Sequence, residues 1–254
     1  VPPSYDGYSG VSGYSYQESS TEYWVTGGDT FSIDISHSDA HSGVNTQFFG
    51  FNHDDCNPNN CGGAPDEIKS HSTGSSVIDN NNDDTYIAIS SVSCVDGDGS
   101  CSDDDMTLSW DSDIAATASD WNYKLHTYQY DQLYIGTGYD DLGVWVKIDN
   151  SDPSTSFSSP ATSSWQDGDF SISTSDSDSR SGIESCSYRI DDGNDGSYDT
   201  TWQSRTCDSS FTVTVGASSD CSVQGNDECK VQLRTIDNVG KDVYLTRTFS
   251  IDYS

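Results

Sequence analysis

The chain has little positive charge and no long apolar run. Of its 254 residues, ten are lysine or arginine and 42 are aspartate or glutamate, so the formal net charge is −32. A chain without a basic patch is a poor partner for nucleic acid, and an anionic membrane surface would repel it. No stretch is long and apolar enough to span a bilayer, so membrane insertion is not expected.

Glutamate, helical periodicity and catalytic motifs are also scarce. Only five of the acidic residues are glutamate. Glutamate suits helices, whereas aspartate suits turns, caps and the coordination of hard cations. No long segment repeats apolar residues with a 3.6-residue period, so helix should be negligible. The sequence has no G-x-S-x-G motif or phosphate-binding glycine loop, and its aspartates are too abundant for any pair to indicate a glycosidase. We therefore expect no enzymatic activity.

Short segments of alternating apolar and polar residues fill the sequence instead. Phe31, Ile33 and Ile35 alternate with polar residues, and Tyr188 and Ile190 do the same later in the chain. Such alternation places one face of a strand in a core and the other in water. Clusters of Gly, Asp, Asn and Ser separate these segments. The pattern predicts an all-β protein built from β-sandwiches.

The sequence also repeats itself, which predicts one structural unit used twice. Residues 31–51 align without a gap with residues 170–190, and upstream Trp24 and Trp165 correspond. We expect an N-terminal strand or donor strand over 1–17, a sandwich with loop insertions over 18–149, and a second sandwich over 150–254. The insertions, expected as loops, are at 54–84 and 94–105.

The eight cysteines fall into four pairs that are close in sequence. An even number with local spacing predicts disulfides formed in an oxidising compartment, and hence a secreted protein. Zinc thiolates are the weaker alternative, because no C-x-x-C knuckle is present. The predicted disulfides are Cys56–Cys61, Cys94–Cys101, Cys186–Cys207 and Cys221–Cys229.

One pattern resembles a known family. A segment D-x-S-x-x-S-G-[IV] is followed by a strand with an aromatic residue and an Asp-Gly turn, then by I-D-N-x-G and F-S-I-D. This order is similar to the tandem immunoglobulin-like (Ig-like) domains of secreted bacterial and archaeal surface and filament proteins. The resemblance is good across 150–254 and looser across 18–149, where Asp131-Gln132 and Asn52-His53 depart from it. It implies β-sandwiches with an extracellular, structural or adhesive role. In the second repeat the residues that carry it are Asp178, Ser181, Gly182, Ile183, Tyr188, Asp192, Gly193, Ile236, Asp237, Asn238, Gly240 and residues 249–252.

Four acidic loops are candidate calcium sites. Aspartate and asparagine recur near glycines in these loops, as oxygen ligands do in calcium loops, although no bidentate glutamate closes any of them. A solvated acidic turn is the alternative for each loop. A halophilic source is another explanation of the acidity, and it is compatible with calcium binding. The candidate ligands are Asp191, Asp192, Asn194, Asp195 and Asp199; Asp96, Asp98 and Asp103; Asp79, Asn81 and Asp83; and, at the junction of the repeats, Asp149, Asn150 and Asp152. The pair His37 and His41 could instead bind zinc, but a polar loop is favoured because no third ligand is apparent.

The N-terminal tract is rich in tyrosine, glycine and serine and has two interpretations. It is either the first strand of the first sandwich or a donor strand that completes a neighbouring molecule's sheet. The two ends of the chain resemble the two sides of the internal junction, which predicts head-to-tail contacts between copies. A contact of this kind that does not close produces a filament. The expected assembly residues are Val1, Pro2, Pro3, Tyr5, Tyr8, Val11, Tyr14, Tyr16, Phe249 and Ile251.

The sequence therefore predicts a calcium-stabilised subunit of an extracellular filament, with copies of itself as the partner. An adhesin or carbohydrate-binding module is the first alternative, with Trp24, Trp121, Trp145, Trp165 or Trp202 as a sugar platform. A fragment of a larger surface-layer or stalk protein and an accessory domain pair of an enzyme remain as further alternatives.

Overall fold

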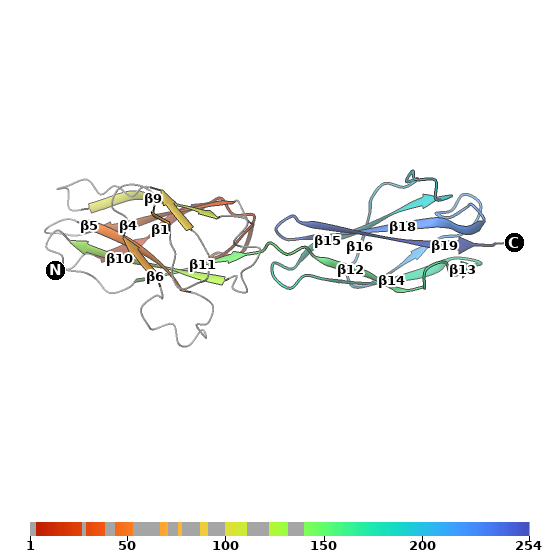
Figure 1. The fold of residues 1–254 in the computed structure, drawn as a ribbon, viewed down its shortest axis with the longest axis horizontal. Helices are drawn as coiled ribbons and strands as arrows, with labels where there is room; N and C mark the ends of the chain where they lie inside the picture. Colours follow the sequence, from red (N-terminus) through yellow and green to blue (C-terminus); the bar gives the residue numbers. More distant parts are fainter. Residues whose placement is uncertain are drawn as a thin grey trace. The chain divides into compact units, whose positions relative to one another are not determined.

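The computed structural model describes residues 4–26, 29–38, 44–52, 67–70, 76–77, 87–90, 100–110, 122–131 and 140–253. All regular structure in these residues is β-strand. They contain no helix of the length and apolarity needed to cross a bilayer. The chain divides into two compact domains, Val1–Asn150 and Ser151–Ser254, which are drawn from red to green and from green to blue in Figure 1.

The first domain has two sheets. One has the strand order β1-β4-β9-β8-β7, and the other has the order β2-β3-β11-β10-β5-β6. Neighbouring strands pair antiparallel except β3 and β11, which pair parallel. The bounds are β1 Ser4–Ser12, β2 Tyr16–Ser19, β3 Glu22–Val25, β4 Thr30–Ser38, β5 Val44–Asn52, β6 Glu67–Ser70, β7 Ser76–Val77, β8 Ile87–Ser90, β9 Ser100–Trp110, β10 Asn122–Asp131 and β11 Asp140–Ile148.

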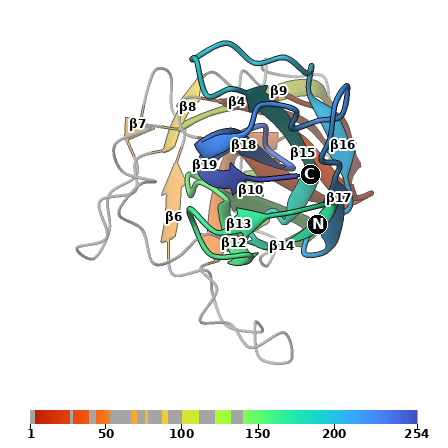
Figure 2. The same cartoon turned by 90° about the vertical axis from the view of Figure 1, so that its right-hand side faces the viewer.

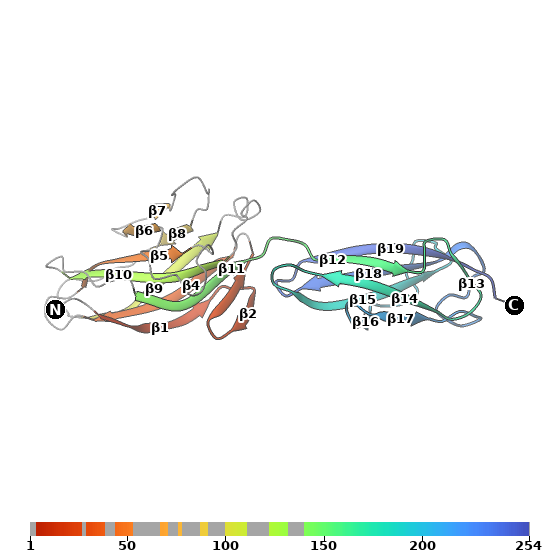
Figure 3. The same cartoon turned by 90° about the horizontal axis from the view of Figure 1, so that it is seen from below.

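The second domain has a three-stranded sheet, β12-β14-β17, and a five-stranded sheet, β13-β19-β18-β15-β16 (Figure 1, Figure 2 and Figure 3). The first strand is divided between the sheets, because β12 pairs antiparallel with β14 whereas β13 pairs parallel with β19. The bounds are β12 Ser154–Ser159, β13 Trp165–Gln166, β14 Phe170–Ser177, β15 Ile183–Asp192, β16 Gln203–Arg205, β17 Ser210–Val213, β18 Gly225–Asp237 and β19 Asp242–Ile251.

The core of the second domain lies between its two sheets. Phe170 from β14 meets Phe249 from β19 with ring centroids 5.0 Å apart, and Tyr188 stacks on Phe211 at 4.1 Å. Alternate residues of β15 and β18 face this core, among them Ile190 and the other apolar residues of the buried cluster. The apolar residues of the alternating segments therefore face the packed interior, as predicted.

The first domain has its own core. Phe31, Ile33 and Ile35 of β4 are fully buried, and alternate residues of β11 face them. Tyr5 and Tyr8 of β1 pack against this cluster and are partly buried. The chain thus consists of two tandem Ig-like β-sandwich domains, with the first strand divided between two facing sheets in the second domain.

Two disulfides are formed in the second domain, as predicted. Cys186 of β15 is bonded to Cys207, which follows β16, and Cys221 is bonded to Cys229 of β18. The other two predicted disulfides lie outside the described residues and side chains. Both observed bridges join segments that the strand order already brings together, so they reinforce the sandwich and do not replace its core.

Both insertions that were expected as loops contain strands. The insertion at 54–84 includes β6 and β7. Residues 100–105 are the start of β9, which pairs with β4 along Ser100–Trp110 (register Ser38↔Ser100 to Thr30↔Ser109). This acidic stretch was expected as a loop because the first repeat is longer than the second at this place. Pairing of its backbone with β4 stabilises the strand regardless of that pattern.

Candidate functional site

Two parts of the motif that resembles the Ig-like family, D-x-S-x-x-S-G-[IV] and I-D-N-x-G, contact each other in the second domain. Their contact joins two turns. Gly182 has a positive φ of 82°, and its carbonyl accepts a 3.0 Å hydrogen bond from the Asn238 amide. The Asn238 side chain donates to the Ser181 carbonyl at 2.6 Å. A Cβ added to Gly182 would lie 3.3 Å from Nδ2 of Asn238, so glycine is required for both conformation and space. The S-G-I and I-D-N-x-G patterns therefore encode one structural contact.

Two carboxylates of the same motif lie beside this contact. Asp178 Oδ1 accepts from the amides of Arg180 and Gly182 at 2.9 and 2.8 Å. Asp237 is fully buried, and its Oδ1 accepts from the amides of Val239 and Lys241.

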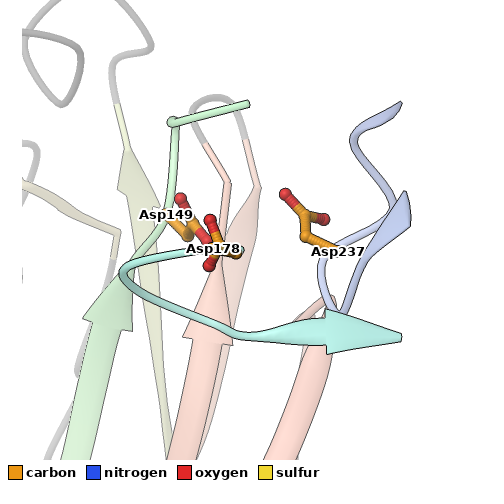
Figure 4. Close-up of side chains that lie close together, drawn as sticks. All are labelled: Asp149, Asp178 and Asp237. Carbon is orange, nitrogen blue, oxygen red and sulfur yellow. The ribbon is translucent and has the colours of Figure 1, made fainter. Parts of the chain in front are cut away.

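Asp178 and Asp237 offer carboxylate oxygens within 4.8 Å of each other. Figure 4 shows Asp178 on the loop after β14 and Asp237 at the end of β18. Hard oxygen ligands at this spacing have the chemistry that Ca²⁺ prefers.

The candidate calcium loop at 191–199 is organised differently. Both carboxylate oxygens of the buried Asp191 accept hydrogen bonds from backbone amides, one from Asp195 at 3.0 Å and the other from Gly196 at 3.1 Å. The Lys230 ammonium lies 2.5 Å from Oδ2 of Asp191. Asp192 accepts from Ser222 and Val223, on a different segment. Within the described residues these carboxylates do not converge into one group. They hold the loop by hydrogen bonds, and calcium binding there stays a prediction.

The other three candidate calcium sites do not form a group of ligands among the described side chains. Asp79, Asn81, Asp83, Asp96 and Asp98 lie outside the described residues, and only the backbone of Asp103 is described, in β9. At the junction, Asp149 is fully buried in the structure and its amide donates to the Val25 carbonyl at 3.0 Å, while Asp152 is exposed.

A buried ion pair in the second domain was not predicted from the sequence. The guanidinium of Arg205 donates to both oxygens of Asp176, at 2.6 and 2.7 Å, and the two side chains are 1% and 0% exposed. Burial by itself would raise the pKa of Asp176. The hydrogen bonds it accepts, above all those from Arg205, outweigh burial and hold that pKa well below its usual range. Because the partners are 29 residues apart, no local motif could have indicated the pair.

Strands β3 and β13 occupy the same place in the two domains, each beside the last long strand of its domain. Trp24 of β3 pairs with Lys147 of β11, and Trp165 of β13 pairs with Ser250 of β19, both in parallel register. These tryptophans are also the ones that correspond in the sequence repeat. The two edges therefore allow a direct comparison.

In the first domain a further strand covers this edge. Strand β2 pairs antiparallel with β3, and the Ser15 amide donates to the Trp24 carbonyl at 2.9 Å. Glu18 accepts from Trp24 Nε1 at 2.9 Å and pairs with Lys147 at 2.7 Å, and the Lys147 ammonium lies 5.3 Å from the centre of the indole ring. Trp24 is consequently only 2% exposed.

In the second domain the edge is open. Strand β13 is the last strand of its sheet, and residues 151–253, all described, contain no counterpart of β2. The reason is local, because β12 and β13 are connected only by residues 160–164, whereas residues 13–21 connect β1 to β3. Trp165 is 58% exposed. An exposed strand edge beside an exposed aromatic side chain can accept an added strand.

The other candidate tryptophans are less accessible. Trp145 is half-buried, with the Lys124 ammonium 5.6 Å from its ring centre. Trp202 is half-buried, with the Arg189 guanidinium 4.5 Å from its ring centre and Tyr244 beside it. Trp121 lies outside the described residues. Among the tryptophans whose side chains are described, Trp165 alone is exposed.

The predicted assembly residues separate into three groups. Tyr5, Tyr8, Val11 and Tyr14 are partly buried against the first domain's own core. The interpretation of the N-terminal tract as the domain's first strand thus matches β1. Residues 1–3 lie outside the described residues, and Tyr16 pairs with Trp24. Phe249 and Ile251 are fully buried within the second domain, so their side chains stabilise that domain and present no surface to another molecule.

No protein-family model and no curated protein sequence matches the chain. Solved structures similar to it include the two Ig domains of DIP-gamma, with 10% identity, a TM-score of 0.43 and coverage of 100% of this chain and 99% of that one. The fibronectin(III)-like modules of Clostridium thermocellum CbhA share 13% identity at a TM-score of 0.34, covering 99% and 94%. The sialic acid binding region of a Streptococcus sanguinis SK1 adhesin shares 9% identity at a TM-score of 0.31, covering 100% and 78%.

Proposed function

We propose that this protein is a non-enzymatic, extracellular structural protein whose copies join head to tail into a filament at the cell surface. The open edge of β13 is the observation that carries the proposal. A contact between this edge and a different surface of the next copy is heterologous, and a heterologous contact that does not close extends into a fibre. The first domain covers the equivalent edge with β2, so within the described residues the open form of this edge is seen at β13.

The disulfides support an extracellular location. Cys186–Cys207 and Cys221–Cys229 both lie in the second domain, and structural disulfides persist in oxidising environments. The net charge of −32 supports the same assignment, because a strongly acidic surface stays soluble in a salty exterior where ions screen its repulsion.

Calcium stabilisation is the second part of the proposal. Asp178 and Asp237 use one carboxylate oxygen each for the turn amides, and their acidic groups lie close together. A divalent cation there would neutralise the repulsion between them and tie the two turns together. The sequence predicts Asp149, Asn150 and Asp152 as a separate candidate calcium site at the junction of the repeats.

Negative-stain imaging of the full chain at high concentration, with Ca²⁺ and with a chelator, tests the filament. We expect fibres of indefinite length whose abundance or order increases with Ca²⁺. Monodisperse single molecules under both conditions would contradict the proposal.

A surface adhesin that binds glycans is the second candidate, and the 58% exposure of Trp165 favours it. Aromatic faces are common platforms for sugar rings because they present apolar area with little conformational freedom. Binding to a glycan array by the wild-type protein, lost in Trp165→Ala, would support this candidate over the filament. An array without signal would exclude it for the sugars tested.

A further inference from the structure

We infer that the open edge of β13 binds the outer edge of β1 from a second copy of this chain, with Trp165 as the buried anchor. The inference rests on the proposed self-assembly and names the surfaces that meet. It follows from three features: what covers the equivalent edge in the first domain, the charge around β13, and the character of β1.

The first domain shows what this edge requires. A short antiparallel strand supplies main-chain hydrogen bonds to β3, and its side chains reduce the exposure of Trp24 to 2%. Strand β13 keeps the same register to its neighbour but lacks that cover, so Trp165 remains 58% exposed. An added strand would supply hydrogen-bond partners to the backbone groups at the edge of β13, and it would bury the indole of Trp165 at the same time.

The charge around β13 limits what can bind there. Asp167 follows the strand, and the amide of Asp252 donates to the Gln166 carbonyl at 3.0 Å, so that exposed carboxylates flank the edge. In a chain with 42 acidic residues, many segments would be repelled. Residues 7–17 contain no charged residue, and they include most of β1.

Strand β1 also has a free edge of its own. It is the end strand of its sheet among the described residues, pairing only with β4. Tyr5, Tyr8 and Val11 of this strand are only partly buried against the first domain's core, so part of each side chain stays exposed. Two register shifts and the positive φ angles of Gly7 and Gly10 interrupt its pairing with β4. An edge of this kind can pair with β13 without leaving its own domain.

Strand β2 is the competing candidate because it is also an end strand. Its Glu18 is already engaged by Trp24 and Lys147, and it adds a negative charge at the flanking carboxylates of β13. Residues 7–12 of β1 carry no charge, and Asp6, the one acidic residue of the strand, lies outside them, so β1 is the better partner.

Sedimentation velocity of the full chain over a range of concentrations tests the contact. Trp165→Ala should weaken self-association about 30-fold, the effect of losing a central aromatic anchor. Tyr244→Ala is the matched control, because Tyr244 is also exposed, at 47%, on the same domain but away from β13. It should associate as the wild type does. Equal association of the wild type and both variants would overturn this inference and leave the filament proposal standing.

A charge placed on β1 tests the partner surface. Ser9 is exposed in β1 and Thr201 is exposed in the second domain. Ser9→Asp should weaken association through repulsion by the carboxylates near β13, whereas Thr201→Asp, with the same change of net charge, should not. Equal effects of the two substitutions would exclude β1 as the partner.

A synthetic peptide of residues 4–17 separates failure of the inference from failure of the filament. It should bind the wild-type chain and not Trp165→Ala, as measured by isothermal titration calorimetry. If the wild type stays monomeric at all concentrations but binds the peptide, the filament fails and the recognition of β1 by β13 stands. If it neither associates nor binds the peptide, both fail.

Discussion

Asp176→Asn should be among the most destabilising single substitutions in the second domain. The substitution keeps the size of the side chain but removes its negative charge. The guanidinium of Arg205, which is 1% exposed, would remain buried without a counter-charge. Asp176 also accepts hydrogen bonds from Thr155 at 2.6 Å, Thr235 at 2.9 Å and the Asp208 amide at 2.9 Å, and an asparagine can satisfy only part of this set.

The expected cost is about 3–5 kcal/mol, the loss typical of removing one partner from a buried ion pair. In a domain of about 100 residues each kcal/mol lowers the melting temperature by at least about 4 °C, so the second domain should melt at least about 12 °C lower. Asp167→Asn is the matched control, because that carboxylate is exposed. It should change stability by less than about 0.5 kcal/mol.

The pH dependence of this difference is a second test. Because the folded state holds the pKa of Asp176 below its usual range, the carboxylate stabilises the fold above the unfolded pKa, near 4. That contribution disappears as the pH falls toward the folded pKa. The difference in unfolding free energy between wild type and Asp176→Asn should therefore shrink below about pH 4. Differential scanning calorimetry across this range measures it, and a difference that is small at pH 7 or constant with pH would refute the reasoning.

Three further predictions concern the same domain. Gly182→Ala should destabilise it by about 1–3 kcal/mol, since alanine must adopt a positive φ and lie 3.3 Å from the Asn238 side chain; urea unfolding measures this, and an unchanged midpoint would contradict the role of the motif. Replacing Cys186 and Cys207 with serine should cost about 3 kcal/mol, because the bridge closes a loop with a sequence separation of 21; equal melting of the variant and the oxidised wild type would argue against it. Asp178→Asn and Asp237→Asn keep one oxygen acceptor but lose the charge, so each should reduce the rise in melting temperature on adding Ca²⁺; a full rise in both variants would place the ion elsewhere.

The strands and the two observed disulfides could be predicted from local sequence patterns. In β4 and β14, Phe31 and Ile33 correspond to Phe170 and Ile172, and all four lie in the buried cores because burial on one face dictates a two-residue period. In β9 the alternation of Met106 and Leu108 predicted the second half of the strand, whereas the acidic first half was missed because its pairing with β4 depends on a distant segment. A local sequence pattern does not indicate which distant strand a segment will pair with.

The candidate sites were less predictable than the fold. The partners Asp176 and Arg205 are brought together by the packing of two sheets, so only the topology reveals them. The motif residues Asp178 and Asp237 stood out in the sequence through the family resemblance, and the structure adds that their turns contact each other. Trp24 and Trp165 correspond in sequence but differ in exposure. The cause is the length of the connection before each, which allows β2 to form in one domain only.

Amide hydrogen exchange of residues 163–168 tests the central claim, that the open edge joins one molecule to the next. The account predicts that exchange in this segment, and above all at the Trp165 amide, slows as the protein concentration rises, while β16, at the opposite edge of the same sheet, is unchanged. Exchange at 163–168 that does not depend on protein concentration would contradict the claim.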